Sequence, residues 1–423
     1  MRRLLFPVLS LSLTACSGSL PIALSGPGKI QSGTAWPACG RVDSFPGAAW
    51  AQPSVEGWDA AKLDKARLLF ESLDSAAVMV VHRGRPVAAW GNVATRYTAQ
   101  SMRKALLNSL IGIAVDRRLL NSNATLAQMG IDDIDPALSA AERQATLRDL
   151  LMSRSGIFHS ALYEVGSWKR DRAKLGQSKA LSPDRYRPGA YWIYNNWDFN
   201  ALGTIAEKAF GRPIGTTFAE LVGEPIGMED FRPADVGYTS RNDATEQRFQ
   251  NWSEHRAYVF DISTRDVARY GLLYLNCGDW NGRRIVSRNW VFESLLGRPT
   301  RDGRNPDEQA TGFGDYGYLW QIDRPGSRRL TNLPTREPIY AATGARGHFM
   351  IVAPYLDLVI VHQVATEGGV GLEAQVKRAT QGSPEVSEED LGRLFRAIIE
   401  AHPRAESAFE NFRPNVQAAA DPL

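Results

Sequence analysis

Segments with strand-like patterns lie near both ends of the 423-residue chain and enclose a long middle part with helical patterns. Two of them, AAVMVVH at 76–82 and RPVAAWG at 85–91, are joined by a turn that contains glycine, which is typical of a hairpin. Three more, YGYLWQI at 316–322, GHFMIVAP at 347–354 and LDLVIVHQV at 356–364, lie near the C-terminus. This order predicts an α+β fold, in which both ends of the chain build one antiparallel sheet with flanking helices and the middle forms an inserted helical subdomain.

Apolar residues recur at helical spacing in six further segments, several of which end near glycine. These segments are 58–73, 101–118, 146–156, 200–211, 264–278 and 387–401. We expect the folded domain to extend over 54–405, with an α/β part formed by 54–120 and 304–405 and a mainly helical part formed by 121–303. Residues 406–423 are expected to be a C-terminal tail.

The first 16 residues, MRRLLFPVLSLSLTAC, combine two arginines, a short apolar stretch and small residues before Cys16, as a secretory signal peptide does. The last four of them are similar to the bacterial lipobox, whose cysteine receives lipid and becomes the mature N-terminus. With Ser17 in the next position, we expect a lipoprotein on the periplasmic side of the outer membrane. An ordinary cleaved signal would instead give a periplasmic protein. Residues 17–53, rich in Gly, Ser, Ala and Pro, are expected to form a flexible tether.

The composition argues against several classes of binding site. The formal charge is only +3 and the arginines are scattered, so we expect no nucleic-acid surface. None of the six histidines has metal-ligand spacing with another His or a Cys, so we expect neither a metal nor a cofactor. Cys39 and Cys277 remain if Cys16 is lipidated. An exported protein would permit a disulfide between them, and two separate thiols are the alternative.

Lys104 follows Ser101 by three positions at the start of an apolar helix, in a chain where only nine of the 49 basic residues are lysine. Residues at i and i+3 share a helix face, so both side chains can point into one site. A helix N-terminus and burial both disfavour an ammonium ion, so a neutral Lys104 could accept the proton of Ser101. Arginine could not do this, because a guanidinium stays protonated. The pair indicates a serine nucleophile; the alternative is a surface pair on an amphipathic helix.

Two further motifs accompany this pair, namely Tyr194-Asn195-Asn196 ahead of a helix and Thr343-Gly344 ahead of a strand. With them, the chain resembles the serine β-lactamase-like hydrolases, which include class C β-lactamases, D-amino-acid-specific peptidases, esterases and 6-aminohexanoate-oligomer hydrolases. The resemblance covers most of 55–402 and implies the β-lactamase-like, or penicillin-binding-protein-like, fold. It also implies that Ser101 is the nucleophile, that Lys104 is its partner, and that Tyr194 is a second base or relay.

The resemblance implies further roles around the same cleft. The backbone N–H groups of Ser101 and Ala345 would form an oxyanion hole. Substrate-binding positions would be Asn196, which could instead hold Lys104, together with Thr343, Gly344 and Arg346. The third motif departs from the family, because Ala342 stands where class C β-lactamases have a lysine that helps hold the carboxylate of penicillins. Arg346 and His348 are candidates to replace that charge; the alternative is that both face solvent or the strand rim.

These observations together predict an exported serine hydrolase that forms an acyl-enzyme at Ser101. The resemblance and the missing lysine favour small esters or linear amides as substrates, hence a carboxylesterase or amidase. One alternative is a β-lactamase or D,D-peptidase that acts on β-lactams or peptidoglycan peptides. Another is a non-catalytic lipoprotein that binds peptidoglycan fragments. The expected partners are a small-molecule substrate and, through the N-terminal lipid, a membrane.

Overall fold

The computed structural model describes residues 39–134, 136–159, 161–163, 187–190, 192–239, 253–300, 314–325, 333, 335–366 and 384–409. The predicted signal peptide with Cys16 and the first part of the predicted tether lie outside these residues, as does the end of the predicted tail after residue 409. Within the described ranges, no helix is both long enough and apolar enough to span a bilayer.

An eight-stranded antiparallel sheet forms the α/β part, with the strands in the order β2-β1-β13-β12-β11-β10-β9-β8. The strands are β1 Ala77–His82, β2 Arg85–Gly91, β8 Arg298–Pro299, β9 Asp315–Tyr316, β10 Gln321–Asp323, β11 Ile339–Gly344, β12 His348–Ala353 and β13 Leu358–Gln363. The β1–β2 hairpin pairs with β13, so that Val80 lies opposite Ile360. The predicted sheet built from both ends of the chain, and with it the α+β fold, is confirmed.

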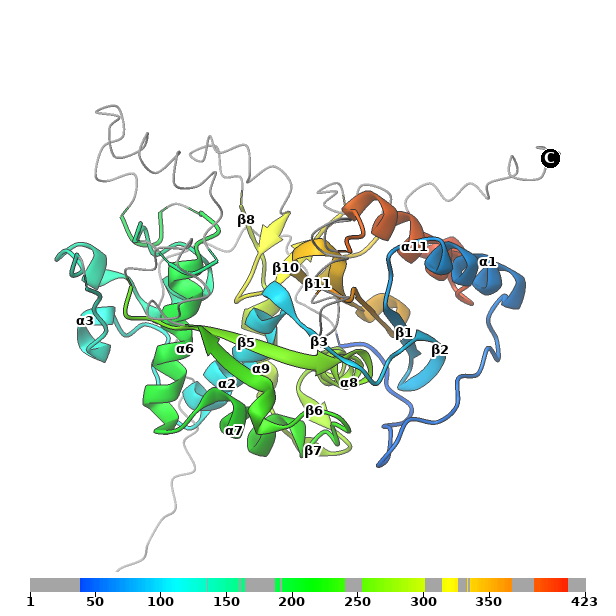
Figure 1. Ribbon diagram of the computed structural model, residues 1–423, viewed down its shortest axis with the longest axis horizontal. Helices are drawn as coiled ribbons and strands as arrows, with labels where there is room; N and C mark the ends of the chain where they lie inside the picture. The colour runs from blue at the N-terminus through cyan, green and yellow to red at the C-terminus, as the bar shows by residue number, and fades with distance from the viewer. Residues whose placement is uncertain are drawn as a thin grey trace, which may run out of the picture. The chain divides into compact units, whose positions relative to one another are not determined.

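Helices cover both faces of this sheet (Figure 1). On one face, α1 (Ala60–Glu71) packs against α11 (Glu388–Glu400), and their apolar side chains share a core with Val80, Ile351 and Ile360 of the sheet. On the other face, α8 (Thr264–Leu275) contacts β1, β12 and β13. Successive strand residues point to opposite faces. The continuous apolar runs in these strands therefore suit a sheet that is covered on both sides.

The remaining helices form the part of the molecule that carries the predicted site, and their bounds are α2 Arg103–Asp116, α3 Leu126–Met129, α4 Leu147–Leu151, α6 Asn196–Phe210, α7 Ile214–Phe218 and α9 Arg288–Leu295. The prediction of a mainly helical 121–303 missed two strands in this range, β4 and β5. Together with β3 they form a second sheet with the order β3-β5-β4. Its strands are β3 Arg96–Thr98, β4 Val236–Thr239 and β5 Ala257–Ser263. A small hairpin, β6 Asp279–Trp280 with β7 Arg283–Arg284, was missed as well. Because β3 leads directly to Ser101, this second sheet fixes where the nucleophile segment begins.

The predicted strand 316–322 is divided into two short strands, β9 and β10, which pair with each other. The turn between them contains Leu319 in the left-handed region, with φ of 64°. A Cβ atom on Gly317 would lie 2.0 Å from the carbonyl oxygen of Ser294, so no other residue fits there. The prediction of one continuous strand was wrong because this turn packs against the end of α9, a contact that the apolar run does not encode.

The folded body includes residues 39–53, which lie ahead of the predicted boundary at residue 54. A disulfide joins Cys39 to Cys277, with their Cα atoms 5.5 Å apart. The backbone N–H of Gly40 donates to the carbonyl oxygen of Leu275 at 2.9 Å. At the other end, α12 (Ala405–Ala408) and the buried Phe409 belong to the body as well, although 406–423 was predicted to be a tail. Both boundaries were misplaced because long-range contacts, not local patterns, hold these segments.

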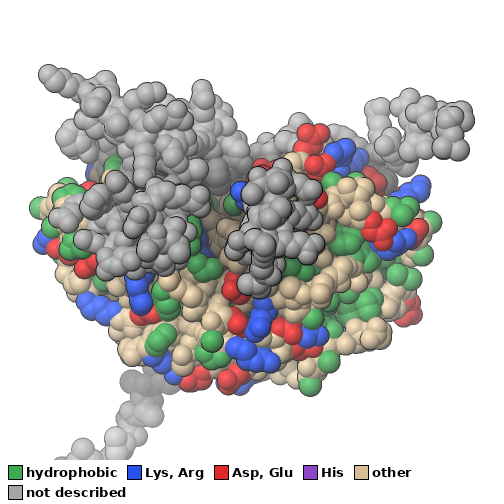
Figure 2. Space-filling view, in the orientation of Figure 1, with side chains coloured by type: hydrophobic (Ala, Val, Ile, Leu, Met, Phe, Trp, Pro, Cys, Tyr) green, Lys and Arg blue, Asp and Glu red, His purple; other side chains and the backbone are tan. Residues whose placement is uncertain are grey.

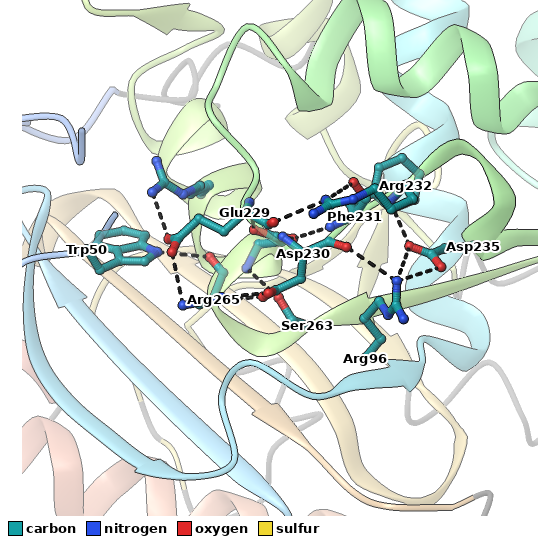
Figure 3. A network of polar contacts seen from close by, with 11 residues as sticks. Trp50, Arg96, Glu229, Asp230, Phe231, Arg232, Asp235, Ser263 and Arg265 are labelled. Atoms are coloured by element: carbon teal, nitrogen blue, oxygen red, sulfur yellow. Dashed lines mark hydrogen bonds and ion pairs between the residues drawn. The ribbon is translucent and has the colours of Figure 1, made fainter. Parts of the chain in front are cut away.

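An ion-pair network fixes the segment around Trp50 and the turn before β4 to the helix α8 (Figure 3). The indole N–H of Trp50 donates to the carbonyl oxygen of Arg265 at 3.3 Å, and the Arg265 guanidinium pairs with Asp230. Nearby, Arg96 of β3 pairs with Asp235 at 3.0 Å. On the face drawn in Figure 2, the acidic and basic side chains are likewise interspersed. The network thus holds β3, and the nucleophile segment after it, on a rigid support.

Candidate active site

Ser101 lies in a short 3₁₀ turn, Gln100–Met102, that leads into α2. The backbone N–H of Ala99 donates to the carbonyl oxygen of Phe260 at 2.8 Å, so β5 holds the chain just before this turn. Gln100 has a φ of 49°, an uncommon left-handed conformation for a residue other than glycine. Such strain next to a reacting side chain is a frequent feature of functional sites, where the surrounding structure maintains it.

Lys104 joins the two hydroxyl groups that the sequence motifs single out. Its Nζ lies 2.6 Å from Ser101 Oγ and 2.5 Å from Tyr194 Oη. The lysine is only 2% exposed, and its ammonium nitrogen lies 4.7 Å from the ring centroid of Tyr194 and 4.6 Å from that of Phe199. The three side chains, from two segments about 90 residues apart, therefore form one hydrogen-bonded cluster.

The segment that carries Tyr194 is held by the end of the predicted helical segment 146–156. Ser153 Oγ donates to the carbonyl oxygen of Ile193 at 2.6 Å and accepts the backbone N–H of Asn195 at 3.0 Å. The Asn195 side chain caps α6 by accepting the N–H of Trp197 at 3.1 Å. Segment 146–156 thus supports the tyrosine through Ser153. The sequence did not indicate this supporting role of Ser153.

Strand β11 brings the third motif against the nucleophile turn. A Cβ atom on Gly344 would lie 2.7 Å from the carbonyl oxygen of Ala99 and 2.9 Å from Cβ of Gln100, so the two backbones approach each other closely. Ala345 follows at the end of the strand, which places its backbone beside the turn that contains Ser101. Thr343 Oγ1 donates to the side-chain oxygen of Gln321 on β10 at 2.9 Å. The predicted oxyanion donors thus lie on adjacent segments.

The predicted substrate-binding residue Asn196 lies at the start of α6, 4% exposed. Its Nδ2 donates to the carbonyl oxygen of Tyr163 at 2.9 Å, whereas its buried Oδ1 has no hydrogen-bond partner in the described part of the chain. Asn196 shows no hydrogen bond to Lys104 among the described contacts.

The candidates to replace the missing lysine differ in their surroundings. Ala342 is 3% exposed and belongs to the apolar cluster on the α2 side of the sheet. Arg346 is exposed and lies 3.9 Å from the carboxylate of Glu385. His348 is fully buried, which argues against the alternative that it faces solvent or the strand rim, and burial lowers the pKa of its imidazole to about 3. His348 is therefore neutral at ordinary pH and does not replace the cation.

Within the described residues, no group of three His, Cys, Asp or Glu side chains is placed to hold a metal ion. A second buried phenol, Tyr258, lies close to the cluster at Ser101, and burial raises the pKa of its hydroxyl well above the usual value. Tyr258 therefore stays protonated near neutral pH.

Comparison with known proteins agrees with this geometry. Among curated proteins, an Escherichia coli O157:H7 protein assigned as a D-alanyl-D-alanine carboxypeptidase is 26% identical over 130 residues, which are 26% of this chain and 30% of that protein. The chain thus spans less than a third of this relative's length. An uncharacterized Alkalihalophilus pseudofirmus protein is 21% identical over 310 residues, 68% of this chain and 82% of its own.

Solved structures share the fold at low identity. A Bacillus anthracis protein assigned as a 6-aminohexanoate-dimer hydrolase superposes with a TM-score of 0.54 at 17% identity, covering 87% of this chain and 90% of its own. A family VIII carboxylesterase gives a TM-score of 0.52 at 15% identity, with 80% and 96% covered. The family model described as Beta-lactamase matches residues 66–380, about three quarters of the sequence. The chain therefore belongs to the beta-lactamase family of serine hydrolases.

Proposed function

We propose that the protein is an exported serine hydrolase that forms an acyl-enzyme at Ser101 and acts on small esters or linear amides. The observation that carries this proposal is the buried Lys104, whose nitrogen contacts the hydroxyl oxygens of both Ser101 and Tyr194. A protein that only binds a ligand has no use for a desolvated lysine between two hydroxyls. The arrangement supports a catalytic role over a non-catalytic, peptidoglycan-binding one.

The proposed reaction passes through two acyl-transfer steps. Ser101 Oγ attacks the substrate carbonyl carbon while its proton passes to the Lys104–Tyr194 pair, and the carbonyl oxygen becomes an oxyanion between the N–H groups of Ser101 and Ala345. The C–O or C–N bond then breaks, and the pair returns the proton to the leaving alcohol or amine. Water next attacks the ester carbon, its proton passes to the pair, and Ser101 regains a proton as the acid leaves.

The substrate preference follows from the charges near β11. The position of the family lysine is occupied by the buried Ala342, His348 is neutral, and the Arg346 guanidinium already lies beside Glu385. A substrate carboxylate would find a weaker counter-charge here than in an enzyme with the lysine. An uncharged ester or amide loses nothing, so these substrates are favoured.

We expect kcat/KM for nitrophenyl acetate or butyrate to exceed that for the β-lactam nitrocefin by at least about tenfold. A hydrogen bond to a charged group contributes about 1.5–3 kcal/mol, and 1.4 kcal/mol corresponds to a factor of ten. Parallel initial-rate assays of both substrates measure the ratio. Ala342→Lys serves as the matched variant: the new side chain would start from the α2 side of the sheet, and we expect it to narrow the gap by improving nitrocefin turnover.

Equal efficiency on both substrates, with nitrocefin turnover lost only in Arg346→Ala, would contradict the ester preference. It would instead support a β-lactamase or D,D-peptidase, the alternative to which the match with the assigned D-alanyl-D-alanine carboxypeptidase lends weight. In that case Arg346 would hold the substrate carboxylate despite its contact with Glu385.

Export as a lipoprotein is the second part of the proposal. The Cys39–Cys277 disulfide supports an oxidising compartment, and the lipobox-like sequence before Cys16 supports lipid attachment. We expect the wild-type protein in the membrane fraction of cells, and Cys16→Ala in the soluble fraction. Fractionation followed by immunoblotting measures this partition. A wild-type protein that is wholly soluble and cleaved at another site would show that no lipid is attached at Cys16.

A further inference from the structure

Arg103 is a buried cation at the start of α2, two positions after Ser101, and the sequence motifs assign it no role. It is 3% exposed, and its Nε donates to the carbonyl oxygen of Tyr258 at 2.5 Å. Its Nη2 lies 3.5 Å from Asn200 Oδ1. The guanidinium carbon lies 4.9 Å from the ring centroid of Tyr258 and 5.5 Å from that of Tyr163. All of these neighbours are neutral.

The absence of a counter-ion distinguishes Arg103 from another buried arginine of this chain. Arg269 is 0% exposed and pairs with the carboxylate of Glu229 at 2.9 Å. No carboxylate lies within 4.0 Å of the Arg103 guanidinium in the described ranges. A buried charge without an opposite charge is costly, and a guanidinium cannot relieve the cost by losing its proton. We therefore expect the charge of Arg103 to have a role that offsets this free-energy cost.

Arg103 and Lys104 are consecutive at the start of α2, and their cationic groups face consecutive residues of α6. Phe199 and Asn200 are consecutive on α6: the ring of Phe199 faces the Lys104 nitrogen at 4.6 Å, and the Asn200 oxygen faces Arg103. The phenol of Tyr258 is close enough to Arg103 and to Tyr194 that the charge state of each affects its pKa. The Tyr258 hydroxyl is buried without a hydrogen-bond partner among the described residues.

We infer that Arg103 is a positioning residue whose unpaired positive charge holds the Lys104–Tyr194 pair in its proton-poor form. This inference rests on the proposed acyl transfer at Ser101. A nearby positive charge disfavours a neutral lysine gaining a proton and favours a phenol losing one. The effect therefore has the same sign whether Lys104 or Tyr194 deprotonates Ser101. In both cases Arg103 extends to lower pH the range in which the serine is activated.

Further ionisable groups lie on the elements packed around α2 and Tyr194, namely Asp198, Glu207 and Lys208 on α6, Tyr258 and Asp261 on β5, Arg265, Asp266, Arg269, Tyr270 and Tyr274 on α8, Arg288 and Glu293 on α9, and Tyr340 on β11. The charged groups of β5 and α8 have other partners: Asp261 accepts from Thr98, Asp266 accepts the backbone N–H groups of 229–231, and the two arginines of α8 pair with Glu229. Burial raises the pKa of all four phenols, so they stay neutral. Glu293 lies on α9, where it pairs with Tyr318. Asp198 is buried at the start of α6 and accepts from Ser155 Oγ. Asp198 is the same in every Arg103 variant, so it does not account for a difference between them.

The test is the pH dependence of Ser101 labelling by a fluorophosphonate probe, which reports serine activation whatever the natural substrate. We expect the acidic limb of the labelling rate to move to higher pH by roughly one unit in Arg103→Met and in Arg103→Gln, the size expected for losing one nearby charge in a partly buried site. Arg103→Lys keeps the charge and should leave the limb within a few tenths of a unit. Arg269→Met, which removes a buried arginine elsewhere, is the matched control and should not move it.

Near-UV circular dichroism and thermal unfolding identify the variants that fold, and the two neutral replacements provide two chances of a folded protein. An unmoved limb in a folded neutral variant would overturn the inference, as would an equal shift in Arg103→Lys, which would make geometry rather than charge the cause. If the wild-type protein takes up no probe at Ser101 at any pH, the proposed function itself fails. If the wild-type protein is labelled at Ser101 and the folded neutral variants keep the same acidic limb, only the role of Arg103 is refuted.

Discussion

Lys104→Arg should lower kcat by about 100-fold or more, the order of magnitude for losing general-base assistance, and should be nearly as damaging as Lys104→Ala. Arginine keeps the positive charge, but it cannot give up its proton to become a base. The site also has little room, because the lysine nitrogen lies 4.7 and 4.6 Å from the ring centroids of Tyr194 and Phe199 and contacts two hydroxyl oxygens. Steady-state assays with a short-chain nitrophenyl ester measure the loss.

Lys62→Arg is the matched control for this experiment. Lys62 is exposed on α1, where it pairs with Asp59 at 3.6 Å, and its replacement should leave kcat unchanged. Thermal unfolding separates a loss of activity from a loss of fold. If Lys104→Arg folds and keeps most of its turnover, Lys104 is a structural cation, and the proton-transfer mechanism is wrong.

The elements that could be predicted from the sequence are those whose burial is continuous along the chain. The run LVIVHQ of β13 is buried at every position, and the hairpin of β1 and β2 is closed by a local glycine turn. In α2, every residue from Arg103 to Ala114 is buried. Local patterns of this kind reflect which face of an element meets the core, so they can be read without knowledge of the partner segment.

The elements that could not be predicted depend on partners far away in the sequence. Cys39 and Cys277 are separated by 238 positions, and no spacing rule indicated that they pair. The strand β5 was missed because its pairing partners, β3 and β4, lie on other segments. The composition of 39–53 is that of a flexible linker, yet contacts with α8 hold this segment.

The candidate site divides in the same way. Spacing alone placed Ser101 and Lys104 on one helix face, and the resemblance to a family added Tyr194. The environment of each charge could not be predicted, because burial and pairing are properties of the folded chain. Arg103 is adjacent to Lys104 in sequence, and only the structure places it among neutral groups. His348 was a candidate cation until its burial was known.

Tyr194→Phe tests the second half of the proton-transfer pair. The change removes only the hydroxyl that contacts Lys104 and keeps the ring, which packs against Phe199 with centroids 4.9 Å apart. We expect kcat for an alkyl ester or a linear amide to fall by about 100-fold or more, the order of magnitude for losing a general acid or base. The melting temperature should change little, since one hydrogen bond contributes about 1 kcal/mol.

The leaving group determines how Tyr194→Phe behaves. Nitrophenolate can leave as an anion without gaining a proton. An alcohol or an amine must gain a proton as it leaves. If Tyr194 returns the proton to the leaving group, the loss should be much smaller for a nitrophenyl ester than for an alkyl ester. An equal loss on both would instead make Tyr194 the group that deprotonates Ser101. The control is Tyr355→Phe, because this phenol contacts only the distant carbonyl oxygen of Ala408 at 3.4 Å and should be dispensable. Full activity of Tyr194→Phe on both esters would leave Lys104 as the only proton carrier and remove Tyr194 from the mechanism.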